Sequence, residues 1–508
     1  MGTILGIAHK RAIIQTNDSK PNRNILVVGG PGSYKTQSMV ITNVLFEQQN
    51  SIVLTDPKGE VYEMTAAIKA AQGYEVHVIN YTNMRASDRH NPLDYVRYDR
   101  DANIVANKII ETSNKDAKRD IWFLSQRALL KALILYAVHE LSPEKRTLGG
   151  IIEFLQLHSA DSKALDQQFE QLPLEHPARK TYELGYKKAK GEVQASIIIS
   201  LLSTIAEYID EDVNRFTSFS DFHLQDVGRK KMILYIIMPL MDSTWQGLIN
   251  IFFQQLFTQL YELAATNHAK LPNEVTFILD EFANLGHFEH YEEFLATCRG
   301  YGIGVMTIVQ TITQLQDKYK DKKAESILGN CAVKICLNAA NETTAKYFSN
   351  LMGDATVKVA TQGKSKNRGS DKSSSSMSDN ESYTRRPLMT PQEIAMMKND
   401  TSIILLANKP PIRAKKAMQF ALFPKLIDNP KWKRLQHLYK NESTPQQLAQ
   451  LQQRQRQFED EQQKKQHARE LELQHQAENI QSFFHKHDET KKEVQQEENI
   501  LSYLKQEP

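Results

Sequence analysis

The ten residues from Val27 to Thr36, Val-Val-Gly-Gly-Pro-Gly-Ser-Tyr-Lys-Thr, constrain the fold more than any other part of the sequence. An apolar run precedes them and helical spacing follows, so we expect a strand-to-helix junction. Glycines let backbone N–H groups close around phosphate oxygens, a lysine reaches the β- and γ-phosphates, and a hydroxyl holds Mg²⁺. The pattern predicts a phosphate-binding loop made of Gly29, Gly30, Pro31, Gly32, Ser33, Tyr34, Lys35 and Thr36. Alternatively, the segment is a glycine-rich turn with an exposed lysine.

One position departs from the usual phosphate-loop pattern, which has glycine immediately before the lysine. This chain has Tyr34 there. We expect Tyr34 to adopt the ordinary dihedral angles of a helix entry, and the departure bears on how a nucleotide would sit in the loop.

Short apolar runs alternate with helical stretches over much of the first 425 residues, which predicts a parallel sheet covered by helices on both faces. The expected strands are 24–28, 51–55, 75–79, 232–237, 275–279, 302–309, 332–337 and 402–406. Almost nothing between residues 95 and 219 reads as a strand, so one α/β domain is interrupted by an all-helical insert. The expected divisions are 1–95, the insert 96–220, 221–425 with a flexible loop at 357–386, and a Gln/Glu/Lys-rich extension at 426–508.

Composition narrows the class of protein. Three cysteines, none in a C-x-x-C spacing, exclude a disulfide framework and indicate a reducing compartment. The longest apolar stretches are interrupted by charges or too short for a membrane span. Residues 442–508 carry a net charge of −4 and the preceding part +7, a basic balance that is compatible with a polyanionic partner.

An apolar run from Val275 to Leu279 ends in Asp280 and Glu281. At the end of a strand, Asp280 is placed to hold the Mg²⁺ shell and Glu281 to polarise an attacking water. Alone, the pair is equally well explained as acids that cap a following helix. With the phosphate loop upstream, the order of motifs predicts a P-loop ATPase that uses ATP and Mg²⁺.

Two further residues are candidates for the same chemistry. Gln310 ends the run 302–309 and is placed to contact the γ-phosphate or a water, although a structural role is as good an explanation. Arg299 is a candidate for stabilising transition-state charge, in its own subunit or across an interface, and the alternative is a charge at a helix C-terminus. By local chemistry alone, Thr55-Asp-Pro-Lys-Gly-Glu60 is a turn.

Together these segments resemble the cytoplasmic part of TraG-type coupling proteins of type IV secretion and conjugation. The resemblance covers about residues 1–425. It rests on the loop 29–36, the segment 55–60, and then, in order, Asn91-Pro-Leu93, Leu279-Asp-Glu-Phe282, Gln310-Thr-Ile-Thr-Gln-Leu315 and Arg386-Pro-Leu-Met-Thr-Pro391.

The resemblance implies a RecA-like nucleotide-binding domain, an all-helical domain and a homo-hexameric ring with ATP at subunit interfaces. It implies that Lys35 binds phosphate and Thr36 binds Mg²⁺, and that Asp280 and Glu281 are the acidic residues of the site. It also implies that Gln310 senses the γ-phosphate and that Arg299 is the arginine finger. The implied partners are DNA, mainly single-stranded and bound without sequence preference, the relaxase with its accessory proteins, and subunits of the secretion channel.

Family members carry two membrane helices before this region. The chain is expected to be either a form from which that anchor has been removed, which we favour, or a variant that relies on a separate anchor. The anchored protein would lie at the cytoplasmic face of the cell membrane as a hexamer, whereas this chain would be cytoplasmic and monomeric. The extension from 441 is either a determinant of substrate recognition or a linker.

The resemblance implies a DNA-dependent ATPase motor that docks the relaxase–DNA substrate to the secretion channel and drives its transfer, and two other functions compete with this motor. One is a non-catalytic receptor that binds nucleotide, DNA and partner proteins. The other is a double-stranded-DNA translocase of the chromosome-segregation kind, which the segment 55–60 and the helical insert disfavour.

Overall fold

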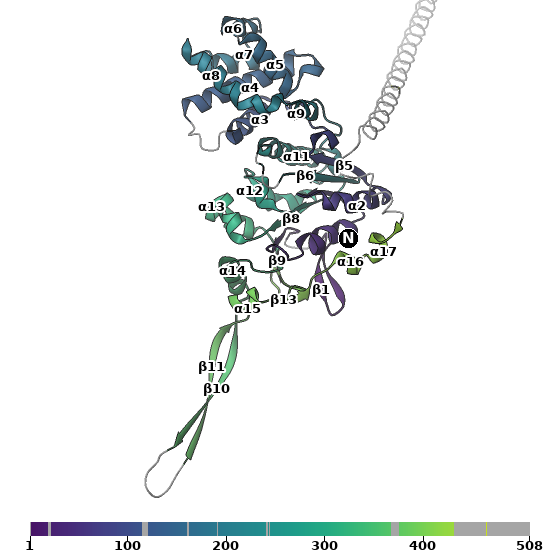
Figure 1. The fold of residues 1–508 in the computed structure, drawn as a ribbon, viewed down its shortest axis with the longest axis vertical. Helices are drawn as coiled ribbons and strands as arrows, with labels where there is room; N and C mark the ends of the chain where they lie inside the picture. The colour runs from purple at the N-terminus through teal and green to yellow at the C-terminus, as the bar shows by residue number, and fades with distance from the viewer. Residues whose placement is uncertain are drawn as a thin grey trace, which may run out of the picture. The chain divides into compact units, whose positions relative to one another are not determined.

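The computed structural model describes residues 2–18, 22–113, 120–159, 162–189, 191–239, 242, 244–366, 375–430 and 464. Within them, eleven strands form one sheet in the order β2-β1-β13-β12-β9-β3-β8-β7-β4-β6-β5 (Figure 1). The strands are β1 Gly2–Ala8, β2 Arg11–Thr16, β3 Ile25–Val28, β4 Ser51–Thr55, β5 Glu75–Asn80, β6 Met232–Ile237, β7 Val275–Leu279, β8 Ile303–Val309, β9 Val333–Cys336, β12 Thr401–Leu406 and β13 Ile412–Lys415.

The seven neighbouring strands from β9 to β5 are parallel. Alternate side chains of each strand enter two separate buried clusters; on β3 these are Leu26 and Val28 against Ile25 and Val27. Helices α1 (Ile41–Phe46) and α2 (Glu60–Ala71) supply one cluster, and α11 (Gln246–Thr266) and α13 (Ile312–Gly329) supply the other. The sheet is therefore covered on both faces, as predicted, and its parallel strands end at one common edge.

The remaining four strands form an antiparallel flank. Strand β12 pairs with β9 and β13, β13 pairs with β1, and β1 pairs with β2. Only β12 was predicted. Strand β13 has four residues, two of them cationic, and β2 is largely exposed, so neither shows the apolar run that marks a buried strand. The sheet is mixed, with a parallel majority.

Between β5 and β6, all the regular elements that the structure describes are helical. Helix α4 packs against α3, α5, α7 and α8. The α-helices of this region are α3 Asp99–Ser113, α4 Ile121–Glu140, α5 Leu148–His158, α6 Ser162–Glu170, α7 Pro177–Gly185, α8 Glu192–Ile205, α9 Glu211–Phe216 and α10 Asp226–Arg229. Residues 1–442 form one compact unit, so the insert's status as a separate domain stays a prediction.

Two helical stretches within the described residues, Ile121–Glu140 and Glu192–Ile209, are long and apolar enough to cross a membrane by length and composition alone. Core helices often pass the same test. Half of the apolar window of helix α4 and a third of the other window are buried inside the protein.

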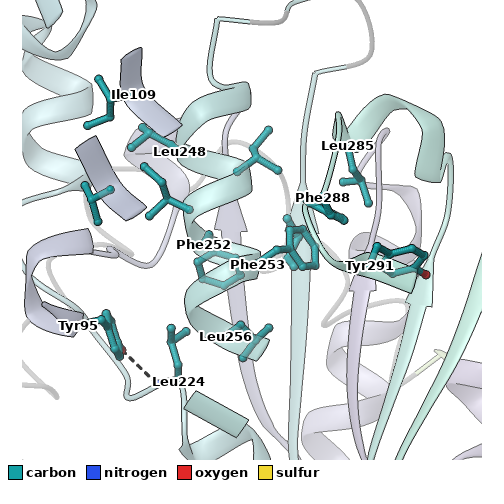
Figure 2. Close-up of a cluster of buried hydrophobic side chains, with 14 of the residues drawn as sticks. Tyr95, Ile109, Leu224, Leu248, Phe252, Phe253, Leu256, Leu285, Phe288 and Tyr291 are labelled. Atoms are coloured by element: carbon teal, nitrogen blue, oxygen red, sulfur yellow. Dashed lines mark hydrogen bonds between the residues drawn. The ribbon is translucent and has the colours of Figure 1, made fainter. Parts of the chain in front are cut away.

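Helix α11 connects the helical region to the sheet through a shared aromatic core (Figure 2). It contacts α3, and Ile109 of α3 and Leu248 of α11 belong to the same buried cluster. Farther along, Phe253 packs on Phe288, with ring centroids 5.0 Å apart. Phe288 follows the acidic residues at the end of β7, so the core supports the loop that carries them.

The segment 357–386 differs from the flexible loop predicted there. Strands β10 (Asp354–Lys366) and β11 (Ser375–Pro387) pair in continuous antiparallel register and extend as a two-stranded hairpin (Figure 1). Ion pairs between Lys358 and Glu381 and between Asp354 and Arg385 join the two strands. A hairpin forms by local pairing, so its strands need no apolar face, and a search for buried runs overlooks them.

The last helices are short: α12 Tyr291–Thr297, α14 Glu342–Met352, α15 Pro391–Ala395, α16 Gln419–Leu422 and α17 Pro424–Ile427. The predicted extension at 426–508 lies outside the described residues, except for 426–430 and 464.

Candidate nucleotide site

A cavity of about 530 Å³ opens where strands β3, β4, β7 and β8 end. It therefore lies at the carboxyl edge of a parallel sheet, the usual place for a ligand in such folds. Its lining comes from four segments of the chain: Gly30, Pro31, Gly32, Ser33, Tyr34, Lys35, Thr36 and Gln37; Asp56, Pro57, Lys58 and Glu60; Asp280, Glu281 and Asn284; and Gln310.

The loop 29–36 has the form of a phosphate cradle. A Cβ at Gly29 would lie 2.6 Å from the Ser33 hydroxyl, and one at Gly30 would lie 2.7 Å from the Ala340 side chain, so both positions require glycine. Gly32 has φ +70°, in the left-handed region. The buried Ser33 hydroxyl has no hydrogen-bond partner among the described residues. The loop is thus shaped by its glycines, and the Ser33 hydroxyl beside its backbone is a donor that no described residue uses.

Tyr34 does not adopt the helix-entry dihedrals that we expected from the sequence. Its φ is +62°, in the left-handed region, which explains why phosphate loops have glycine at this position. The side chain lies on the cavity wall and is 45% exposed. Tyr34 therefore adopts the backbone conformation that glycine has in phosphate loops, and this conformation is strained for a tyrosine.

Lys35 is buried and its ammonium has two partners. Nζ donates to the Gly29 carbonyl at 2.8 Å and lies 3.4 Å from Oε1 of Glu281. The other carboxylate oxygen of Glu281 accepts a hydrogen bond from Nε2 of Gln310 at 2.9 Å. The structure brings these three predicted residues together, with Glu281 held between a cation and an amide.

Glu281 has φ +50° and ψ +43°, an uncommon conformation for a residue with a Cβ. Its backbone N–H donates to Oδ1 of Asp280 at 3.0 Å. Strain of this kind is typical of residues whose side-chain direction matters for function.

Thr36 and Asp280 form the candidate metal pair. The Thr36 hydroxyl donates to Oδ2 of Asp280 at 3.2 Å. Burial, reinforced by the neighbouring Glu281 charge, raises the pKa of Asp280 to about 6, against the opposing effect of Lys35. A hydroxyl beside a buried carboxylate is a donor set that suits Mg²⁺, so the residues fit the ion.

The segment 55–60 makes the expected turn, since the Gly59 N–H donates to the Asp56 carbonyl at 3.1 Å, but it also belongs to the site. The Thr55 hydroxyl donates to the Asp280 carbonyl at 2.7 Å. Asp56, Lys58 and Glu60 line the cavity. Their position at the end of a strand next to β7 is the signal that could have identified them, because parallel strands end at the same edge.

Asp56 is a buried carboxylate within this segment. Its Oδ2 accepts the Tyr62 N–H at 2.7 Å. Burial, with smaller contributions from Glu60 and Asp280, raises the pKa of Asp56 to about 7. Four carboxylates, those of Asp56, Glu60, Asp280 and Glu281, therefore share this cavity with two lysines.

Arg299, like Gly29, is a predicted site residue that does not line the cavity of its own chain. It is exposed and lies in the short helix η7 (Cys298–Tyr301), before the amino end of β8. Gln310 follows the carboxyl end of the same seven-residue strand. At about 3.3 Å per residue, the two ends of β8 are roughly 20 Å apart, so Arg299 lies far from the cavity of its own chain.

Comparison with known proteins agrees with this geometry. Residues 7–472 match the family model described as Type IV secretory system Conjugative DNA transfer. The chain belongs to this family. The sequence-based prediction of a type IV coupling protein with a P-loop fold is thereby confirmed.

Curated relatives within the family are distant in sequence. Protein VirD4 of Rhizobium radiobacter is 26% identical over 423 residues, which are 80% of this chain and 58% of the relative. Conjugal transfer protein TraG of Agrobacterium fabrum is 25% identical over 438 residues, 82% of this chain and 63% of the relative. The chain thus spans about three fifths of the length of the curated relatives that it matches.

Solved structures share the fold. Plasmid coupling protein TrwB in complex with ADP and Mg²⁺ aligns with a TM-score of 0.56 at 17% identity, covering 78% of this chain and 86% of TrwB. VirB4 of Thermoanaerobacter pseudethanolicus aligns with a TM-score of 0.51 at 12% identity, covering 82% of this chain and 96% of VirB4. These matches confirm the predicted fold class.

Proposed function

We propose that this chain is the nucleotide-hydrolysing part of a conjugative coupling protein. It binds DNA and the relaxase–DNA substrate, docks that substrate to the type IV secretion channel and drives its transfer by ATP hydrolysis. The observation that carries the proposal is the convergence of Lys35, Thr36, Asp280, Glu281 and Gln310 on one cavity. The nucleotide-bound structures of TrwB support it.

The loop 29–36 binds the phosphates through its backbone N–H groups and the Ser33 hydroxyl. Lys35 exchanges the Gly29 carbonyl and Glu281 for phosphate oxygens, which carry more charge and are equally accessible to a flexible ammonium. Thr36 and Asp280 hold Mg²⁺, which, when bound, neutralises charge on the β- and γ-phosphates.

Glu281 and Gln310 act on the attacking water. The Gln310 amide fixes one carboxylate oxygen of Glu281 and orients the water, and Glu281 accepts the water proton. The water oxygen forms a bond to the γ-phosphorus while the bond from that phosphorus to the β-bridging oxygen breaks. The products are ADP and inorganic phosphate.

A ring completes the site, because Arg299 lies at the opposite end of β8 from Gln310. We infer that Arg299 of one copy stabilises transition-state charge in the cavity of the next copy, within a homo-hexamer of the membrane-anchored protein. Single-stranded DNA is gripped through its phosphates without sequence preference. The relaxase, its accessory proteins and the channel subunits are the protein partners, and the cytoplasmic face of the cell membrane is the location.

ATP hydrolysis with and without single-stranded DNA tests the proposal. The parent should hydrolyse ATP faster with DNA, and Lys35→Ala and Glu281→Gln should each lose at least about 100-fold of that rate. Lys322→Ala, a cation removed from an exposed helix surface, is the matched control and should retain it. A parent that stays silent even when concentrated or membrane-anchored would contradict the proposed motor.

Arg299 is tested by mixing variants. Arg299→Ala and Lys35→Ala should each be inactive alone. In an equal mixture, about one interface in four combines an intact cavity with an intact arginine, so activity should return to roughly a quarter of the parent level. No recovery on mixing would remove Arg299 from the mechanism.

A second candidate is a non-catalytic receptor in which nucleotide serves only assembly. The departure at Tyr34 favours it, because the usual phosphate-loop pattern has glycine at this position. A receptor would bind nucleotide, DNA and partners equally well in Glu281→Gln, with no turnover in the parent.

A further inference from the structure

The phosphate loop is also held from outside the cavity, by residues that no motif marks. Nζ of Lys416 donates to the Ser33 carbonyl at 2.8 Å. Nδ2 of Asn399 donates to the Gly32 carbonyl at 3.3 Å. Neither the Lys416 nor the Asn399 side chain lines the cavity, so both contact the loop from the side opposite to the cavity. They come from the antiparallel flank, beside β12 and β13.

Lys416 is an unusual residue to find there. It is 4% exposed, and its ammonium donates to the Ser33 carbonyl and, at 3.5 Å, to the Asn399 amide oxygen. A buried ammonium is costly unless its contacts compensate for lost water. Burial lowers the pKa of Lys416 to about 8, although Cys336 and Asp400 partly oppose the shift. A neutral side chain would cost less free energy to bury, so the charge at this position indicates a role.

The contact with Ser33 fixes the orientation of one peptide group. In a trans peptide the carbonyl oxygen and the following N–H point in opposite directions. A donor that holds the Ser33 oxygen from behind therefore turns the Tyr34 N–H toward the cavity, where phosphate oxygens would lie. The same ammonium lies 5.9 Å from the centre of the Tyr34 ring, within the range of a cation–π contact.

Tyr34 makes this restraint necessary. Because a tyrosine at φ +62° is strained, rotation of the Ser33–Tyr34 peptide would relieve the strain and turn the Tyr34 N–H away from the cavity. A glycine at this position would have no such strain to relieve.

We propose that Lys416 is a positioning residue of the nucleotide site, which holds the Ser33 carbonyl so that the tyrosine-containing loop keeps the shape that a glycine would otherwise provide. The inference rests on the proposed nucleotide site. It assigns a role to a residue 380 positions away from the loop and links that role to the departure at Tyr34.

Binding of Mg·ADP, measured by calorimetry, tests the proposal in two backgrounds. In the parent, Lys416→Met should weaken binding about tenfold or more, the loss expected for one hydrogen bond from a charged donor. In a Tyr34→Gly background the same substitution should cost less than about threefold, because the loop no longer needs the restraint. Lys416→Arg should restore most of the affinity.

Lys415→Ala is the matched control, since Lys415 is exposed, pairs with Asp400 and does not touch the loop. Its Mg·ADP affinity should equal that of the parent. Urea unfolding identifies variants that fold, and Lys416→Gln replaces any methionine variant that does not.

Three outcomes would overturn the inference. Unchanged affinity in Lys416→Met removes the role of Lys416, and an equal loss in both backgrounds removes the link to Tyr34. A parent that binds no Mg·ADP, with Lys35→Ala giving the same result, removes the nucleotide site itself and the inference with it.

Discussion

The two flanks of the sheet meet the phosphate loop from opposite sides and with different chemistry. The parallel strands present ionisable groups to the cavity, namely Asp280, Glu281 and the carboxylate of Asp56. The antiparallel flank supplies Asn399 and Lys416, which donate to backbone carbonyls behind the loop. On the proposed mechanism, the first set acts on a ligand and the second set shapes the loop that binds it.

The two sides of the loop therefore differ in what their buried charges do. We call the cavity side of the loop its front and the side of Asn399 and Lys416 its back. Both sides bury charge, but the carboxylates of the front lie where a nucleotide and Mg²⁺ would compensate their charge. The charge of Lys416 at the back is compensated permanently by protein groups. Substitutions on the front should therefore change turnover, while those on the back should change affinity or stability.

Glu281→Gln tests the front most directly, and we expect the largest effect. Without a carboxylate to accept the proton of water, turnover should fall about 10²- to 10⁴-fold, while Mg·ATP binding stays close to the parent value. Steady-state hydrolysis and equilibrium binding measure the two quantities. If affinity fell as far as turnover, Glu281 would belong to the loop's scaffold, and the comparison would break.

Asp56→Asn tests the cost of charge on the front in the absence of ligand. The pKa of Asp56 is about 7 in the folded chain, against 3.8 for an ordinary aspartate. Below that ordinary value both states are protonated; as pH rises toward 7, the unfolded state loses its proton first and parent stability falls. Asp56→Asn should thus be more stable than the parent by a few kcal/mol above pH 7.

Urea unfolding between pH 5 and 8 measures this difference. The advantage of Asp56→Asn should shrink toward acidic pH. A constant difference across that range would mean that the carboxylate is not buried in its charged form.

Thr42→Val tests the back. The Thr42 hydroxyl donates to the Ala417 carbonyl at 2.6 Å, next to Lys416. Its loss should destabilise the fold by about 1–2 kcal/mol and leave the rate constant for hydrolysis unchanged. A change in that rate constant without a change in stability would assign chemistry to the antiparallel flank.

Tyr34→Gly should have the smallest effect, because two terms oppose. Relief of left-handed strain gains about 1–2 kcal/mol, and the greater freedom of glycine in the unfolded chain costs about 0.5–1 kcal/mol. A net stabilisation near 0.5–1 kcal/mol is expected in urea unfolding. A clear destabilisation would show that the tyrosine ring contributes packing beyond the Lys416 contact.

The sequence predicted the front of the site well because its residues follow strands that read as apolar runs. Asp280 and Gln310 each stand directly beyond such a run, Lys35 ends the glycine-rich loop that follows another, and parallel strands bring their ends together. The segment 55–60 was read only as a turn because turn chemistry explains it without reference to a neighbour.

The back of the site was not predictable in the same way. Asn399 and Lys416 flank a short, partly charged pair of strands, and their partners are backbone carbonyls, which leave no trace in side-chain patterns. The helix-entry dihedral angles predicted for Tyr34 were wrong for a related reason, because the surrounding contacts override the local backbone preference of a tyrosine. The hairpin of β10 and β11 was missed because pairing, and not burial, forms it.

Strand β8 has one further consequence. It carries Gln310 at one end and leads from Arg299 at the other, so no copy is able to serve its own cavity with its own arginine. On the proposed mechanism, ATP hydrolysis therefore needs more than one copy of the chain. Its rate should rise more steeply than linearly with protein concentration. A solitary chain would be idle, which protects the cell from futile hydrolysis until a ring has closed.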